Sequence, residues 1–148
     1  VGDVVTDQFD GLSVAVEGSL EAMIFDTANP TGGDYDLRSD DLGKVLIISE
    51  DGDSTNPDDN IRGGNIMFDW DGAVNLASIG LLDMEESGST ITLFGIDDTT
   101  VLATIEIPTL GDNSYQSLDI GVDAIGKMDV FLAGSGAITE IIVDDSAV

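Results

Sequence analysis

Short runs in which apolar and polar residues alternate dominate this chain. Ile66, Phe68 and Trp70 share one face of an extended segment, with Asp69 and Asp71 on the opposite face. Because successive side chains of a strand point to opposite faces, such runs predict β-strands with one buried side. We therefore expect Trp70 to belong to the core. Similar alternation occurs over residues 12–16, 91–93, 101–107, 128–132 and 138–142.

Two further runs, Val45–Ile48 and Ile79–Leu82, are apolar almost throughout, as strands buried on both faces are. Together with the alternating runs they predict about nine short strands. No stretch keeps apolar residues at helical spacing, and the chain contains 18 Gly. This combination is typical of an all-β fold. We expect a two-sheet β-sandwich of the jelly-roll type with calcium-binding loops.

The length of the chain, 148 residues, suits one domain. It begins with Val1, Gly2 and Asp3, without a basic stretch or an apolar run of the targeting type. We therefore expect residues 1–148 to be a single module excised from a larger protein. No apolar run reaches the length of about 18 residues that a membrane span needs, so the sequence predicts no such span.

Charge narrows the possible functions. The chain carries 30 acidic and 4 basic residues, for a net charge of −26, and it has neither His nor Cys. A polyanion of this kind repels nucleic-acid backbones, so no nucleic-acid partner is expected. Without His and Cys the usual zinc sites, thiol nucleophiles and Ser-His-Asp triads are excluded. We expect a monomer within a multidomain chain.

The acidic residues gather in loops at strand ends. One cluster spans Asp26–Asp36 around a Pro-Thr-Gly-Gly turn, a second spans Glu50–Asn60, a third spans Asp83–Ser87, and a weaker fourth spans Gly111–Ser114 with Asp119. Calcium takes six to eight oxygens from carboxylate, amide and backbone carbonyl groups, so these loops predict several calcium ions. The candidate metal ligands are Asp26, Asn29, Asp34, Asp36, Glu50, Asp51, Asp53, Asp58, Asp59, Asn60, Asp83 and Glu85.

Two other interpretations of these clusters stay open. Asp, Asn and Gly dominate ordinary turns for conformational reasons alone. Halophilic surfaces are also acidic, although their charges are spread evenly. The second cluster is not an EF-hand, because Asn56 occupies the Gly position and Arg62 the position of the terminal Glu. The lack of basic neighbours favours bound cations, because uncompensated carboxylates in one loop repel one another.

Polar and aromatic residues in the same loops are candidates for binding a further ligand. Strand-end loops on a rigid sandwich are where binding residues concentrate. Tyr35 and Tyr115 supply aromatic groups in polar surroundings, and Arg62 could pair with a ligand carboxylate. The candidate ligand-binding residues are Asp34, Tyr35, Asp53, Asp58, Arg62 and Tyr115.

Several segments carry a resemblance to a known family. They are Met23–Asp34, Val45–Asp53, Pro57–Asn60 and Gly80–Glu86, with Asp129–Val143 fitting the closing strands. The chain resembles the calcium-binding jelly-roll modules of large secreted bacterial surface proteins, in particular the ligand-binding domains of repeats-in-toxin adhesins. The resemblance implies a secreted or cell-surface module without catalytic activity that binds several Ca2+ ions. It also implies a ligand on another cell, either an exposed peptide end or a glycan.

Three functions are compatible with these observations. The first is calcium-dependent ligand binding in adhesion. The second is a structural spacer domain stiffened by calcium. The third is a hydrolase acting through paired carboxylates, which glycosidases hold about 5–10 Å apart. A catalytic pair needs one carboxyl group in a partly apolar cleft, whereas these clusters lie in polar turns, so we expect no enzymatic activity.

Overall fold

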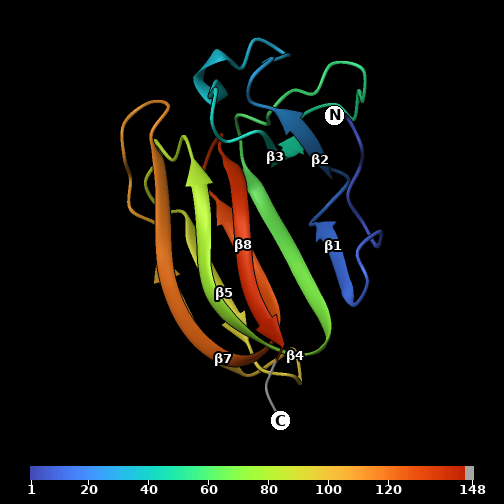
Figure 1. Ribbon diagram of the computed structural model, residues 1–148, viewed down its shortest axis with the longest axis vertical. Helices are drawn as coiled ribbons and strands as arrows, with labels where there is room; N and C mark the ends of the chain where they lie inside the picture. Colours follow the sequence, from blue (N-terminus) through green and yellow to red (C-terminus); the bar gives the residue numbers. More distant parts are fainter. Residues whose placement is uncertain (146–148) are drawn as a thin grey trace.

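The computed structural model describes residues 1–145, and it is built from β-strands. Within this part of the chain the only helical element is η1, one turn of 3-10 helix at Tyr35–Leu37. No helix there is long and apolar enough to span a membrane. The strands are β1 (Leu12–Val16), β2 (Glu21–Asp26), β3 (Lys44–Ser49), β4 (Gly64–Leu82), β5 (Thr90–Phe94), β6 (Val101–Glu106), β7 (Tyr115–Leu132) and β8 (Ala137–Asp145) (Figure 1).

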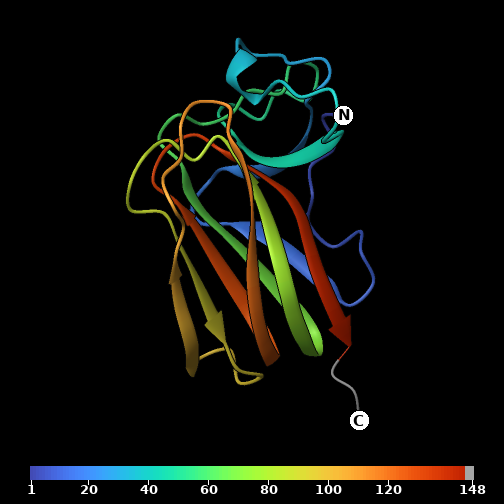
Figure 2. The ribbon, with the colours of Figure 1, turned by 60° about the vertical axis from the view of Figure 1, so that its left-hand side comes forward.

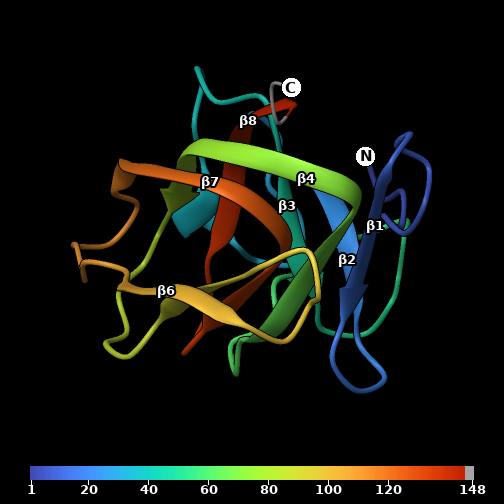
Figure 3. The same ribbon diagram turned by 90° about the horizontal axis from the view of Figure 1, so that it is seen from below.

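Two long strands, β4 and β7, run through both layers of the fold. They pair with each other antiparallel, with residues 64–69 of β4 opposite residues 127–132 of β7. After a shift in register, residues 74–82 of β4 lie opposite residues 115–125 of β7. Seen from below, both strands curve from one layer into the other (Figure 3).

The other strands pair with the two halves of β4 and β7 and complete two sheets. β1 pairs with the first half of β4, and β5 pairs with the second half of β7, so one layer runs β1-β4-β7-β5-β6. β8 pairs with the second half of β4, so the other layer runs β7-β4-β8-β3-β2. The fold is therefore an all-β sandwich, as the alternating runs predicted.

The sequence placed strand boundaries incorrectly at the bend of β4. The alternating run that ends at Trp70 and the apolar run at Ile79–Leu82 were expected to be separate strands, but both belong to β4. Asp71 and Gly72 lie exposed between them and continue the strand. The pairing of β4 with β7 is interrupted here by a shift in register, from Asp69 opposite Lys127 to Val74 opposite Ile125.

The main core lies between the two sheets and contains Ile66, Phe68 and Ile79 among its buried side chains. Trp70 packs at the margin of this core and is only partly buried. Its ring stacks on that of Phe68, with centroids 6.4 Å apart. Trp70 therefore shares the inward face of its strand with Phe68, as the alternation indicated, but part of it stays in contact with solvent.

A second, smaller core covers the outer face of the β2-β3-β8-β4 sheet at one end of the sandwich. It is formed by Met23, Phe25, Val45, Ile47, Leu82, Ala137 and Leu37. Leu37 comes from η1 and is fully buried. Because Leu37 is inserted there, the acidic loop between β2 and β3 is fixed against the sheet.

Candidate metal centre

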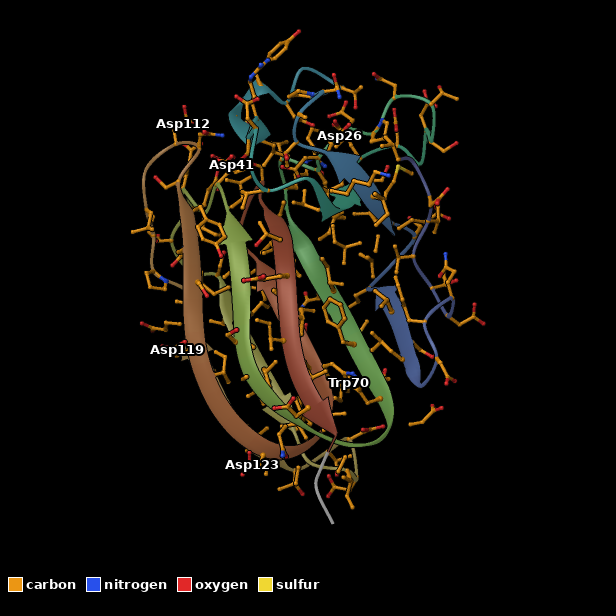
Figure 4. The ribbon with its side chains drawn as sticks, in the orientation of Figure 1. Asp26, Asp41, Trp70, Asp112, Asp119 and Asp123 are labelled. Atoms are coloured by element: carbon orange, nitrogen blue, oxygen red, sulfur yellow. The ribbon has the colours of Figure 1, made fainter. Side chains whose placement is uncertain are left out.

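Four carboxylate groups from three separate segments meet at one end of the sandwich. Asp36 lies in η1, Asp83 and Glu85 directly follow β4, and Asp112 lies in the loop between β6 and β7. One oxygen of each can be chosen so that all four lie within 4.8 Å of one another. Figure 4 shows Asp112 at this end of the molecule, where its loop approaches η1.

Asn113 ties two of these segments together. Its side-chain amide donates hydrogen bonds to the carbonyl oxygens of Asp36 and Arg38, the latter at 2.9 Å. Its backbone N–H donates to Oδ1 of Asp83 at 2.9 Å. One residue of the β6–β7 loop therefore positions both the η1 backbone and the Asp83 carboxylate.

Asp83 is the innermost group of the centre. It is fully buried and has a φ of 64°, in the left-handed region that residues other than Gly rarely adopt. Its second oxygen accepts a hydrogen bond of 3.3 Å from the hydroxyl of Ser135. Burial, and next the contact with the Asp36 carboxyl group, raise the pKa of Asp83 to about 8. A buried carboxylate with a like-charged neighbour needs a proton or a cation nearby.

Three more acidic residues extend the centre toward the loop between β3 and β4. Oδ2 of Asp34 accepts a hydrogen bond of 2.6 Å from the backbone N–H of Asp59, and Oδ2 of Asp59 accepts one of 2.9 Å from Gly136. Burial raises the pKa of Asp34 to about 7, with a further contribution from the charge of Asp58. Burial also raises the pKa of Asp59 well above its usual value.

No basic side chain compensates these charges in the described part of the chain. The one ion pair found among residues 1–145 joins Arg38 to Asp40 at 3.8 Å, and both side chains are largely exposed. The charges of Asp34, Asp36 and Asp83 all raise the pKa of Asp59. These seven acidic residues thus form one continuous acidic region.

The donor set fits calcium. Calcium binds carboxylate oxygens at about 2.3–2.6 Å, so two ligands on opposite sides of one ion lie about 5 Å apart. The 4.8 Å limit on the four carboxylates is compatible with a single ion among them. All the donors are hard oxygens, which excludes the soft ligand sets of zinc and copper sites. One such group of carboxylates occurs in residues 1–145, whereas the sequence predicted several ions.

The structure brings together half of the candidate metal ligands. Asp34, Asp36, Asp58, Asp59, Asp83 and Glu85 lie in or beside the centre. Asp26 instead closes its own turn, with its carboxylate accepting hydrogen bonds from Ala28 and Asn29. These bonds lower the pKa of Asp26, as expected for an ordinary capped turn.

The outer part of the second cluster also forms local turns. The carboxylate of Asp53 accepts hydrogen bonds from the backbone and hydroxyl of Thr55, which lower its pKa. Asp51 accepts a hydrogen bond from the backbone of Asp53. Asn60 is buried and donates to the carbonyl of Gly63. Glu50 and Arg62 are exposed.

Asp112 and Asn113 were not among the candidate ligands chosen from the sequence. They belong to the fourth cluster, Gly111–Ser114 with Asp119, which was considered the weakest of the four. Only the fold shows that this loop crosses to the end of β4. Its Gly-Asp-Asn-Ser composition was the one available signal, and the same composition is common in ordinary turns.

An open hollow of about 480 Å³ adjoins the centre, and Asp36 and Asp112 contribute to its lining. Tyr35, Arg38 and Asn113 complete the polar side of this hollow. The Tyr35 side chain is 72% exposed. A neighbouring hollow shares Arg38 and Asn113 and reaches Tyr115. Tyr35 therefore lies beside two of the carboxylates and Tyr115 lines the neighbouring hollow, whereas Asp53 and Arg62 line neither.

Comparison with known proteins gives the fold. No protein-family model matches the chain, and no curated protein matches it. Among solved structures, the chain is similar to CpGH89CBM32-6 produced by Clostridium perfringens, a carbohydrate-binding module. The two share 15% sequence identity with a TM-score of 0.50, over 94% of this chain and 97% of that chain. This likeness supports the β-sandwich architecture.

A second solved structure is the enzymatically active domain of tailspike protein 4 from bacteriophage CBA120. It shares 13% identity with a TM-score of 0.44, over 93% of this chain and 20% of that chain. Both neighbours are rich in β-structure.

Proposed function

We propose that this chain is a non-catalytic, calcium-dependent glycan-binding module of a secreted or cell-surface bacterial protein that acts in adhesion. One observation carries the proposal. Four carboxylates gather within 4.8 Å without an ion-pair partner in the described residues, and two of them, Asp36 and Asp112, line an open hollow. Such a centre is costly when bare and is stabilised by a hard divalent cation.

The residues of the chain have separate roles in this proposal. Asp36, Asp83, Glu85 and Asp112 would hold the calcium ion, which supplies positive charge and fixes the loops. Asn113, in the β6–β7 loop, holds this loop against the end of η1 and against Asp83 through its hydrogen bonds. Arg38 offers guanidinium donors to the ligand, and Tyr115 offers a half-exposed ring at the far side of the second hollow.

A glycan suits the two hollows better than a peptide end does. Both hollows carry hydroxyl, amide, carboxylate and guanidinium groups that match sugar hydroxyls, beside apolar surface that suits the faces of a sugar ring. A free peptide carboxylate would meet a strongly negative surface, with only Arg38 and the bound ion to attract it. The similarity in fold to a carbohydrate-binding module agrees with this choice.

Binding without catalysis is favoured by the spacing of the carboxylates. Glycosidases place two carboxyl groups on either side of the bond to be broken, about 5–10 Å apart. Here four carboxyl groups, not two, converge in one group that suits a single cation. We therefore assign the centre to ion binding.

Calcium titration calorimetry tests the ion site. Asp83→Asn keeps the size of the side chain and removes its charge, so it should weaken calcium binding by more than about tenfold. The matched control is Asp123→Asn, an exposed carboxylate at the opposite end of the sandwich (Figure 4). Equal calcium affinities for the two variants would show that the four carboxylates are not the site.

A glycan array, probed with and without calcium, tests the ligand. Retention of a glycan by the unmodified protein in calcium, and its loss with Arg38→Ala, is the expected result. A protein that binds calcium but retains no glycan would support the spacer function instead.

A further inference from the structure

The second sheet is incomplete beside β8. One side of β8 pairs with β4 from Ala137 to Asp145. On its other side, β3 meets it at one register position, with Leu46 opposite Ile138. Within residues 1–145 no strand pairs with β8 on this side beyond Ile138. Figure 2 shows β8 as the margin of its sheet below β3.

An apolar groove of about 250 Å³ lies along this free edge. Ile138 and Ile141 of β8 form one wall, and Leu12 and Phe68 of the opposite sheet lie at its base. Phe9 closes the outer side, although its side chain is 54% exposed. The groove thus opens directly into the core between the two sheets.

The groove continues toward the other end of β8. A second hollow shares Phe9 and Leu12 with the first and reaches Trp70 and Val143. The half-buried indole of Trp70 therefore lies near Val143, toward the C-terminal end of β8. The hydroxyl of Thr139, which lines the first hollow, is buried and finds no hydrogen-bond partner in the described residues.

The shape of this region matches one extended strand. From Ile138 to Val143 the free edge has room for about six residues, or roughly 20 Å of strand. An added strand would form main-chain hydrogen bonds with β8, and every second side chain would enter the groove over Phe68 and Trp70. This is the pattern of recognition by strand addition.

Charge decides which strand fits. Asp10 and Asp71 line the second hollow. Glu140 and Lys44, of opposite charge, line the first, and the Glu140 carboxylate also accepts a hydrogen bond of 3.3 Å from the Tyr115 hydroxyl. The chain as a whole carries a net charge of −26, so a second copy of it would be repelled. A segment with Lys or Arg at its outward positions or flanks complements this rim.

We propose that the free edge of β8 and the groove beside it bind an extended, basic peptide segment of another protein by strand addition. The segment presents small or β-branched apolar side chains to the groove and basic side chains to its acidic rim. This site shares no lining residue with the four-carboxylate centre, and it would give the module a second partner besides its glycan.

The sole tryptophan of the chain, Trp70, provides the readout. The probe is the synthetic peptide acetyl-Lys-Val-Thr-Val-Lys-Val-Lys-amide, titrated into the calcium-loaded protein. A saturable shift of Trp70 emission to shorter wavelength is expected, because the added strand covers the indole. A peptide with Pro at the central Val cannot complete the main-chain pairing, and should bind at least about tenfold more weakly. A peptide with Glu in place of each Lys should not bind.

Two protein variants locate the binding. Phe9→Ser removes an exposed side chain from the groove wall and should lower the affinity for the Lys peptide by about tenfold or more. Ile96→Ser, a matched change at a 72% exposed position in the turn between β5 and β6, should leave it unchanged. The proposal is overturned if the Lys peptide leaves Trp70 emission unaltered, or if the Pro peptide binds equally well. Equal effects of the two substitutions, or concentration-dependent dimers in sedimentation, would also overturn it.

Discussion

The side-chain amide of Asn113 donates a hydrogen bond of 2.9 Å to the carbonyl oxygen of Arg38, across two loops that are far apart in sequence. The same residue donates its backbone N–H to Asp83. The carboxylates of the centre are therefore held in place by a residue that carries no charge. Positioning and ion binding can accordingly be separated by substitution.

Asn113→Ala should weaken calcium binding while leaving all four carboxylates in place. A side-chain hydrogen bond contributes about 0.5–1.5 kcal/mol, so a loss of roughly threefold to tenfold in affinity is expected. Calorimetric titration measures it, with Asn75→Ala as a control for loss of an amide near β7, where the Asn75 side chain accepts a hydrogen bond from Ala124. An unchanged calcium affinity for Asn113→Ala would mean that the loop contact does not position the ligands.

Calcium should raise the thermal stability of the domain. An ion bound only by the folded state adds about 2.7 kcal/mol at a hundredfold excess over Kd. For a domain of this size that corresponds to a rise in Tm of roughly 5–10 °C. Differential scanning calorimetry in chelator and in excess calcium measures this difference. Superimposable curves would show that the clusters are solvated turns, as in the halophilic interpretation.

Without calcium, stability should fall as the pH rises. The folded-state pKa values of Asp34 and Asp83, about 7 and about 8, lie above the value of 3.8 for an unperturbed Asp. The folded state therefore binds more protons than the unfolded state between these limits. This contribution to stability is complete below about pH 4 and is lost as the pH rises through the folded values.

Urea unfolding in calcium-free buffer at about pH 5 and about pH 8 measures this dependence. The midpoint should be lower at the higher pH, and added calcium should reduce the difference at the upper end because the ion replaces the protons. A midpoint that rises with pH in calcium-free buffer would contradict the burial of these carboxylates.

Leu37→Ala should disturb both the second core and the calcium site. The Leu37 side chain is fully buried against Met23 and Phe25, so its truncation should cost about 2–5 kcal/mol of unfolding free energy. Calcium affinity should fall with it, because the neighbouring Asp36 loses its support. Leu102→Ala, on the exposed side of β6, is the control and should change neither property appreciably. A destabilised Leu37→Ala protein with normal calcium affinity would separate the core from the site.

Local patterns were sufficient for the fold class but not for connectivity. The apolar run Val45–Ile48 lies within β3, as predicted. The first half of β7 was missed, although Leu118, Ile120 and Val122 alternate with polar residues there. Asp119 and Gly121 lie between them and Asp123 follows, which is the composition of a turn, and only the pairing with β4 makes this segment a strand.

The candidate site was predictable only in part, for a similar reason. Asp83 and Glu85 could be paired from their spacing at a strand end. Their meeting with Asp36 and Asp112 depends on how three loops are brought to one end of the sandwich, which no local pattern encodes. Short turns such as that of Asp53 and Thr55 have the same composition as ion sites, so the sequence could not separate the two.

The passage of β4 and β7 through both sheets has a mechanical consequence. The N-terminal segment and the end of β8 lie toward opposite ends of the long axis of the molecule (Figure 1). A pulling force applied between them would load the strands lengthwise, so that many backbone hydrogen bonds must break together. Because the two sheets share β4 and β7, one sheet cannot slide over the other without breaking the pairing of these strands. We therefore expect the domain to resist extension when force is applied along its long axis.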